Sequence, residues 1–170
     1  MPEPHVYLNE LASDEAAAAL GRCCGAARWV EQMNALRPFA SSAALYAEAE
    51  RVWRGLSVED HVEAFAHHPR IGASRAELER RFGATAALSG KEQAGVAAAN
   101  AQVLEALHAG NVAYGERFGF VFLVCASGKS ATEMLALLTT RLANDRATEL
   151  RIAADEHVKI TRLRLGGLSS

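Results

Sequence analysis

Residues 41–69 read SSAALYAEAERVWRGLSVEDHVEAFAHHP and contain two helix signals in direct succession. One of the two opening serines is a suitable N-cap, and apolar residues then recur at helical spacing as far as Gly55. Ser57 is followed three residues later by an aspartate, which is the spacing of a capping box for a second helix. Pro69 ends that helix, because proline lacks a backbone donor and restricts the residue before it.

The same signals extend over the whole chain of 170 residues, in which only four prolines occur. The predicted helices cover residues 14–22, 29–36, 42–54, 58–66, 89–110, 130–142 and 146–165, with a short solvated helix inside 70–88. One segment near residues 118–126 departs from this pattern, because aromatic and β-branched residues make it locally strand-like. A lone strand has no partner, so we expect an extended segment packed against helices. The sequence thus predicts a single all-α domain, residues 1–170, with a bundle of about eight helices.

Composition excludes several classes of protein. The 18 basic and 20 acidic side chains give a formal net charge of −2, which argues against a nucleic-acid or anionic-membrane binder. The longest apolar run, Phe120 to Ala126, is far shorter than the ~20 residues of a membrane-spanning helix. No signal peptide is expected from the first residues. Cys23, Cys24 and Cys125 lack metal-binding spacing, so we expect structural thiols in a reducing compartment, the cytoplasm.

The first candidate for chemistry is the pair His67-His68, which precedes Pro69 at the end of a predicted helix. Such a corner presents an imidazole to a cleft, and histidine exchanges protons near neutral pH. The alternative is a histidine that caps the negative end of the helix. No metal site is predicted, because the other histidines lack ligand-type residues at the usual spacings.

A second candidate is the run Ser89, Gly90, Lys91, Glu92 and Gln93, which opens the long predicted helix. Its carboxylate and carboxamide could orient an imidazole and a polar substrate at the positive end of the helix dipole. Ser89 and Glu92 also have the spacing of a capping box. Both interpretations are compatible, because Gln93 is not used by the box and keeps its hydrogen bonds.

Two further motifs contain cations. Ser127-Gly128-Lys129-Ser130 resembles the end of a phosphate-binding loop, but the glycine required five residues before Gly128 is Leu123. In the last predicted helix, Arg164 falls on the same side as His157 and Ile160, whereas Arg162 points elsewhere. A half-buried arginine on that side would bind an anion with two parallel hydrogen bonds.

Taken in order, the motifs HHPRIG, SGKEQ, ERFGFVFLVCASGKS and EHVKITRLRL resemble one family, the decarboxylases of 2-oxo-4-hydroxy-4-carboxy-5-ureidoimidazoline (OHCU). The resemblance implies a cofactor-free homodimer that converts OHCU to (S)-allantoin and CO₂, the last step from urate to allantoin. It implies His68 as acid/base, with Glu92 and Arg164 as its catalytic partners. The substrate-binding residues it implies are Pro69, Ser89, Gly90, Lys91, Glu92, Gln93, Phe122, Leu123, Val124, Cys125 and Ala126.

The family's place in urate degradation implies functional coupling to urate oxidase and hydroxyisourate hydrolase, with no nucleic acid, membrane or metal involved. Two alternatives remain from the residues alone. One is a non-catalytic helical interaction module, in which the histidines, glutamate and arginine are caps and surface ion pairs. The other is nucleotide binding through Ser127 to Ser130, which predicts stabilisation by ATP and Mg²⁺.

Overall fold

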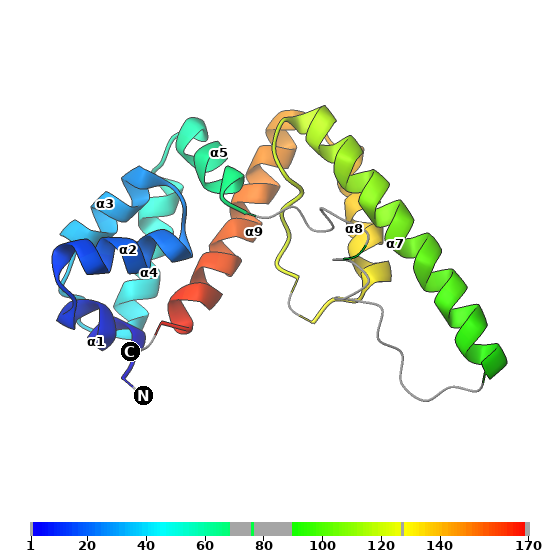
Figure 1. Ribbon diagram of the computed structural model, residues 1–170. Helices are drawn as coiled ribbons and strands as arrows, with labels where there is room; N and C mark the ends of the chain where they lie inside the picture. Colours follow the sequence, from blue (N-terminus) through cyan, green and yellow to red (C-terminus); the bar gives the residue numbers. More distant parts are fainter. Residues whose placement is uncertain (1, 69–75, 77–89, 127, 169–170) are drawn as a thin grey trace. The chain divides into compact units, whose positions relative to one another are not determined.

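The structure is a computed structural model that describes residues 2–68, 76, 90–126 and 128–168, with only the backbone described within 90–99. The described residues form eight α-helices and no strand, which confirms the predicted all-α class (Figure 1). The helices are α1 (Pro4–Glu10), α2 (Ser13–Cys23), α3 (Ala27–Ala35), α4 (Ser42–Arg54), α5 (Val58–Ala66), α7 (Gly90–Phe118), α8 (Ala131–Leu142) and α9 (Arg146–Gly166). No helix among them is both long and apolar enough to cross a membrane.

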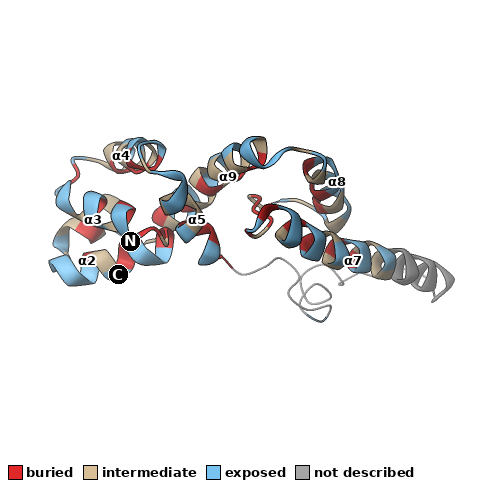
Figure 2. Cartoon of the chain, turned by 90° about the horizontal axis from the view of Figure 1, so that it is seen from above, coloured by how far each residue is buried: buried red, intermediate tan, exposed pale blue. Residues whose placement is uncertain are grey.

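The helices are distributed over two compact units. The first unit comprises Met1–His68 and Leu150–Ser170, and the second comprises Pro69–Glu149, so the boundary falls within α9. In Figure 2, buried and exposed residues alternate along α8 and α9, as expected for helices with one apolar face. Each unit contains fully buried apolar side chains and some of the residues predicted for the site.

The first unit is built on α1 to α4, which pack against one another. Its core contains large, fully buried side chains from each of these helices, among them Leu8, Leu20, Trp29 and Leu45. The Trp29 indole donates a hydrogen bond of 3.0 Å to the Ala49 carbonyl and so links α3 to α4. The N-terminal helix α1 was not predicted from the sequence. Its N-cap residue, Glu3, forms no capping hydrogen bond through its side chain.

The helix starts follow the capping signals in the sequence. The Ser41 hydroxyl accepts a hydrogen bond of 3.0 Å from the Ala44 amide at the start of α4. At α5, the Ser57 hydroxyl accepts from the Asp60 amide while the Asp60 carboxylate accepts from the Ser57 amide, which confirms the predicted capping box. The ends at Ala35, Arg54 and Ala66 also agree with the predicted breakers.

The second unit contains α7 packed against α8, with Leu107, Tyr114, Met134 and Leu138 fully buried. The prediction that the long helix ends at Gly110 is wrong, because α7 continues to Phe118. A Cβ atom at Gly110 would lie 2.6 Å from Leu138 Cδ2, so this glycine permits a close approach of α8. A glycine in a helix interior costs ~1 kcal/mol of stability relative to alanine, and the close packing of α7 against α8 offsets that cost.

The segment after α7 forms neither helix nor strand over residues 121–126, as expected for a strand-like sequence without a partner. Gly119, at φ +79°, turns the chain out of α7 in a conformation that suits glycine. Figure 1 shows the segment as the yellow trace that follows α7. Its residues Phe122, Leu123 and Val124 are buried, with exposures of 2%, 3% and 5%.

Candidate functional site

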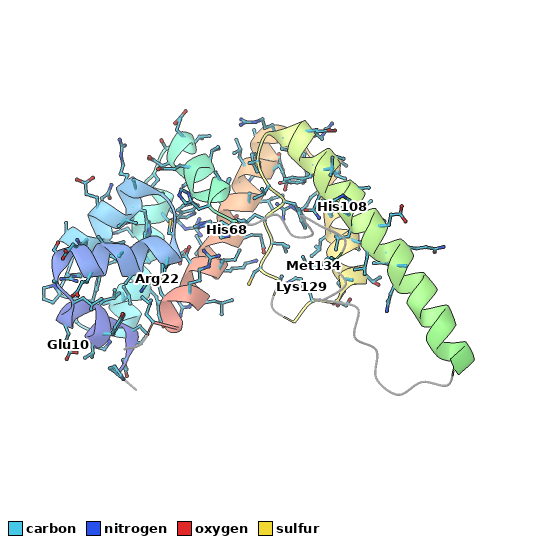
Figure 3. The ribbon with its side chains drawn as sticks, in the orientation of Figure 1. Glu10, Arg22, His68, His108, Lys129 and Met134 are labelled. Carbon is cyan, nitrogen blue, oxygen red and sulfur yellow. The ribbon has the colours of Figure 1, made fainter. Side chains whose placement is uncertain are left out.

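The two histidines at the end of α5 have different environments. His67 is exposed, and its Nδ1 forms a hydrogen bond of 2.9 Å with the Glu63 carbonyl, so it caps the helix. His68 follows it and is only 9% exposed (Figure 3). The capping interpretation therefore applies to His67, and the site interpretation remains with His68.

Arg164 of α9 contacts His68 directly. The distance from Arg164 Nη2 to His68 Nδ1 is 3.3 Å. A guanidinium group can only donate, so Nδ1 must be the acceptor, and the proton of a neutral His68 is on Nε2. Arg164 also donates a longer hydrogen bond of 3.5 Å to the Arg22 carbonyl. Arg164 is half-buried while Arg162 is exposed, as the helical spacing predicted.

His68 is held in its neutral form. Burial lowers its pKa to about 4, and the positive charges of Arg164 and His67 act in the same direction. The side chain is therefore uncharged at neutral pH and able to accept a proton. Its Nε2 atom is buried and has no hydrogen-bond partner among the described residues.

A second buried histidine, His157, lies against His68. The two rings meet edge to face, with centroids 4.9 Å apart and an angle of 84°. His157 stacks on the Trp53 indole at 4.1 Å, and its Nδ1 lies 3.1 Å from the Thr161 hydroxyl. Burial is the main cause that lowers the pKa of His157 to about 3, with smaller contributions from His68, Arg164 and His61. Among the described residues, the groups around His68 are thus aromatic rings and the positive charges of Arg164 and His67.

The turn after α2 lies close to the histidine pair. A Cβ atom at Gly25 would lie only 2.4 Å from the Cγ atom of His67, so a side chain at this position would displace His67. Cys23 and Cys24, which precede it, are free and buried. Burial raises the pKa of Cys23 to about 11 and that of Cys24 to about 12. Such thiols are not nucleophiles at neutral pH, as expected for structural cysteines.

In the second unit, the predicted substrate-binding segment includes the buried Phe122, Leu123 and Val124, followed by Cys125 and Ala126 at intermediate exposure. Lys129, labelled in Figure 3, donates a hydrogen bond of 2.8 Å to the Cys125 carbonyl. Ser130 caps α8, because its hydroxyl accepts a hydrogen bond from the Glu133 amide. The cation and hydroxyl that a phosphate-binding loop would need thus have local roles in the fold.

A buried charged cluster in the same unit was not found from the sequence. Arg141 forms an ion pair with Glu149, and their side chains are 7% and 0% exposed. Tyr114 donates a hydrogen bond of 2.5 Å to Glu149, and Arg141 Nη1 donates one of 2.5 Å to the Leu123 carbonyl. The Arg141 guanidinium also lies 4.7 Å from the centroid of the Phe122 ring. A signal existed, because Arg141 lies three residues after Leu138 on the inward face of α8.

Several predicted site residues lie outside the part of the chain that the structure describes. Pro69 and Ser89 are not described, and neither is the short helix predicted within 70–88. Gly90, Lys91, Glu92 and Gln93 form the first turn of α7, but their side chains are not described. Among the described residues there is no group of three or more histidine, cysteine or acidic side chains arranged to hold a metal ion.

A buried, neutral histidine beside a guanidinium in an all-helical fold is an arrangement suited to acid/base chemistry on an anionic compound. Comparison with known proteins then gives the family. The family model for OHCU decarboxylase matches residues 9–166, so the chain belongs to the OHCU decarboxylase family.

Individual relatives agree with this family. The uric acid degradation bifunctional protein of Arabidopsis thaliana is 36% identical over 148 residues, which are 87% of this chain and 45% of that protein. The OHCU decarboxylase of Amia calva is 36% identical over 131 residues, which are 76% of this chain and 73% of that protein. A crystal structure of OHCU decarboxylase in the presence of (S)-allantoin matches with a TM-score of 0.68 at 34% identity, covering 85% of this chain and 92% of that one.

The bifunctional relatives are considerably longer than this chain. The chain spans 45% of the length of the Arabidopsis protein and 32% of that of a bifunctional protein from Bacillus subtilis. The decarboxylase family model nevertheless matches residues from both compact units.

Proposed function

We propose that this protein decarboxylates OHCU to (S)-allantoin and CO₂, the last step in the conversion of urate to allantoin. The observation that carries the proposal is the buried, neutral His68 with Arg164 at its Nδ1 atom. This pair combines a base that is unprotonated at neutral pH with a donor group suited to a carboxylate. Family membership supplies the substrate, because the residues alone identify only an acid/base site for an anion.

Arg164 and His68 act one after the other, with Arg164 binding the substrate before His68 accepts a proton. In the substrate-free protein Arg164 donates to Nδ1, so the basic nitrogen is occupied. The carboxylate of OHCU competes for the guanidinium, because charge-assisted bonds to an anion are stronger than a bond to a neutral imidazole. Nδ1 is then free to accept the proton of the substrate hydroxyl. Substrate binding thus exposes the base.

Glu92 and residues 122–126 have supporting roles in the proposal. Glu92 accepts the Nε2 proton of His68 and stabilises the imidazolium that forms during the reaction. The backbone of residues 122–126 pairs with the planar ureido and ring amides of the substrate. The orphaned Nε2 atom of His68 supports the first role, and the family match over both units supports the second.

The chemistry balances without a cofactor. The bond between the ring carbon and its carboxylate breaks, CO₂ leaves, and the electron pair enters the conjugated C=N and C=O groups of the ring. His68 takes the hydroxyl proton and returns a proton to one face of the ring, which sets the configuration of (S)-allantoin. One solvent proton balances the charge of the departing carboxylate. The protein contributes orientation and proton transfer.

We extend the proposal to the setting of the enzyme. The two units act as one decarboxylase domain, residues 1–170, and the active form is a homodimer in the cytoplasm. Urate oxidase and hydroxyisourate hydrolase generate the substrate upstream, so the protein is functionally coupled to them. Size-exclusion chromatography with light scattering tests the dimer, since a monomeric mass in active fractions would contradict it.

The activity is tested by generating OHCU in situ from urate with urate oxidase and hydroxyisourate hydrolase and following circular dichroism. We expect optically active allantoin to appear much faster with the protein than without it. Racemic product at the spontaneous rate would refute the proposed function. Parallel thermal-shift measurements with ATP and Mg²⁺ test the nucleotide alternative, for which we expect no stabilisation.

A further inference from the structure

The contacts of Arg141 connect α8 to the segment that follows α7. Its Nε atom donates a hydrogen bond of 2.5 Å to Glu149, and Nη2 lies 3.3 Å from the Tyr114 hydroxyl. The remaining nitrogen, Nη1, donates to the Leu123 carbonyl. All three nitrogens therefore have a fixed partner within the second unit.

A buried ion pair is a poor source of stability, because removing two charges from water offsets most of their attraction. Replacing a buried ion pair by apolar side chains of similar volume is often neutral or stabilising. The cluster is better explained by its contact with the backbone. Glu149 holds the guanidinium from one side, and the guanidinium holds the Leu123 carbonyl from the other.

The Leu123 carbonyl needs such a partner. Residues 121–126 belong to no helix or strand, so no regular hydrogen bonding fixes their backbone. Two side-chain cations contact this backbone among the described residues, Arg141 at the Leu123 carbonyl and Lys129 at the Cys125 carbonyl. At the end of the segment, the Lys129 amide donates a hydrogen bond of 3.2 Å to the Ala126 carbonyl. The backbones of Phe122 and Val124 form no hydrogen bond to another described residue. The two cations therefore fix one set of backbone groups and leave the neighbouring set for another partner.

We propose that Arg141 is a positioning residue for substrate binding, because its hold on the Leu123 carbonyl determines which backbone groups of residues 122–126 face the substrate. This inference rests on the proposed function in one respect, namely that the segment binds OHCU. Lysine cannot replace arginine in this role, since an ammonium lacks the planar fork that bonds Glu149 and Leu123 together.

The test compares Arg141→Lys with Arg146→Lys in the full chain. Arg146 is a matched control, because its Nε donates a hydrogen bond of 3.1 Å to the Phe118 carbonyl, outside the predicted binding segment. We expect Arg141→Lys to raise KM by roughly ten-fold, with a smaller change in kcat. Amide hydrogen exchange should become faster in peptides that cover residues 120–126. Arg146→Lys should not change KM, and any change in its exchange should be confined to the region of Phe118 and Phe120, which Arg146 contacts, and spare residues 122–126.

A second variant distinguishes a loss of positioning from a loss of the folded structure. Arg141→Met combined with Glu149→Met removes both charges and keeps the volume apolar, so it should retain the helical circular dichroism spectrum and show the same rise in KM. Unchanged exchange over 120–126, or faster exchange with unchanged KM, would overturn the inference. If the wild-type protein is inactive, the proposed function fails by itself. The exchange comparison then decides whether Arg141 holds the segment.

Discussion

The two buried polar clusters of this protein differ in how completely their hydrogen bonds are made. Around Arg141 in the second unit, a charged pair, a phenol and a backbone carbonyl satisfy one another. Around His68 in the first unit, the Nε2 atoms of His68 and His157 are buried without a partner in the described part of the chain. Unsatisfied buried groups cost free energy and concentrate where chemistry needs them. Under the two proposals above, the difference separates a cluster that positions the backbone from one that takes part in proton transfer.

The electrostatics of the two clusters follow the same division. His68 is shielded from water by burial and lies near the positive charges of Arg164 and His67, and both effects lower the pKa of its imidazole. In the other cluster, burial and the hydrogen bond to Glu149 raise the pKa of Tyr114, which keeps its proton on the phenol. One cluster thus contains a ready proton acceptor, and the other contains a fixed proton donor. Four substitutions test this division.

The largest effect is expected from His68→Asn, with His67→Asn as its control. Proton transfer by a positioned side chain contributes about 10²–10⁴-fold to turnover, so the rate of allantoin formation should fall by that factor. His67 caps a helix end, and its replacement should leave the rate within a few-fold of wild type. Near-wild-type turnover in His68→Asn, measured by circular dichroism with OHCU generated in situ, would remove His68 from the mechanism.

Arg164→Lys should produce the next largest effect. The substitution keeps the positive charge but loses the planar guanidinium, which can bind a carboxylate with two parallel hydrogen bonds. We therefore expect kcat/KM to fall by about ten-fold to a hundred-fold. Arg162→Lys is the control, because Arg162 is exposed and its guanidinium lies over the Tyr46 ring at 4.4 Å. A greater loss in Arg162→Lys than in Arg164→Lys would mean that the other arginine serves the site.

Tyr114→Phe tests the satisfied cluster. The variant removes a hydrogen bond to a buried carboxylate, so it should lower the free energy of unfolding by about 1.5–3 kcal/mol. Denaturant titration measures that difference. Activity at a temperature where the variant is folded should stay near wild type, because Arg141 keeps its contact with Leu123. A strong loss of turnover without a loss of stability would place Tyr114 in the chemistry instead.

The smallest effect is a change in how stability depends on pH. His157 has a pKa of about 3 in the folded protein, below its ordinary value near 6.5, so the unfolded chain binds more protons between these values. Stability contributed by neutral His157 is therefore present above pH 6.5 and lost as the pH falls toward 3. His157→Phe keeps the contact with Trp53 and should flatten the fall in Tm on acidification. An identical pH profile in both proteins would contradict the assigned cause.

The local signals of the sequence predicted most of the helices correctly. Serine caps and glycine or proline breakers mark helix ends through backbone chemistry alone, so α4 and α5 could be located to within a residue. Gly110 was misassigned because a glycine that ends a helix and one that admits a neighbouring helix look alike in sequence. Only the position of Leu138 distinguishes the two cases.

The site was predicted unevenly for similar reasons. Helical spacing placed Arg164 beside the inward face of α9, where it contacts His68. The same argument applies to Arg141 on α8, but its partner Glu149 comes from another helix, and such pairing is not visible in a single sequence. The family resemblance identified His68, Glu92 and Arg164 as a set. Their joint action remains a prediction, and the His68 and Arg164 substitutions above test two of its three members.

The close approach of Gly25 to His67 limits which sequences can carry this site. A single methyl group at position 25 would overlap the His67 ring, and the displacement would be transmitted through one peptide bond to His68. Gly25 has no chemical role of its own, yet it should tolerate no replacement during evolution or in a library of variants. A turn more than forty residues away in sequence thus constrains the position of the His68 imidazole, the proposed acid/base group.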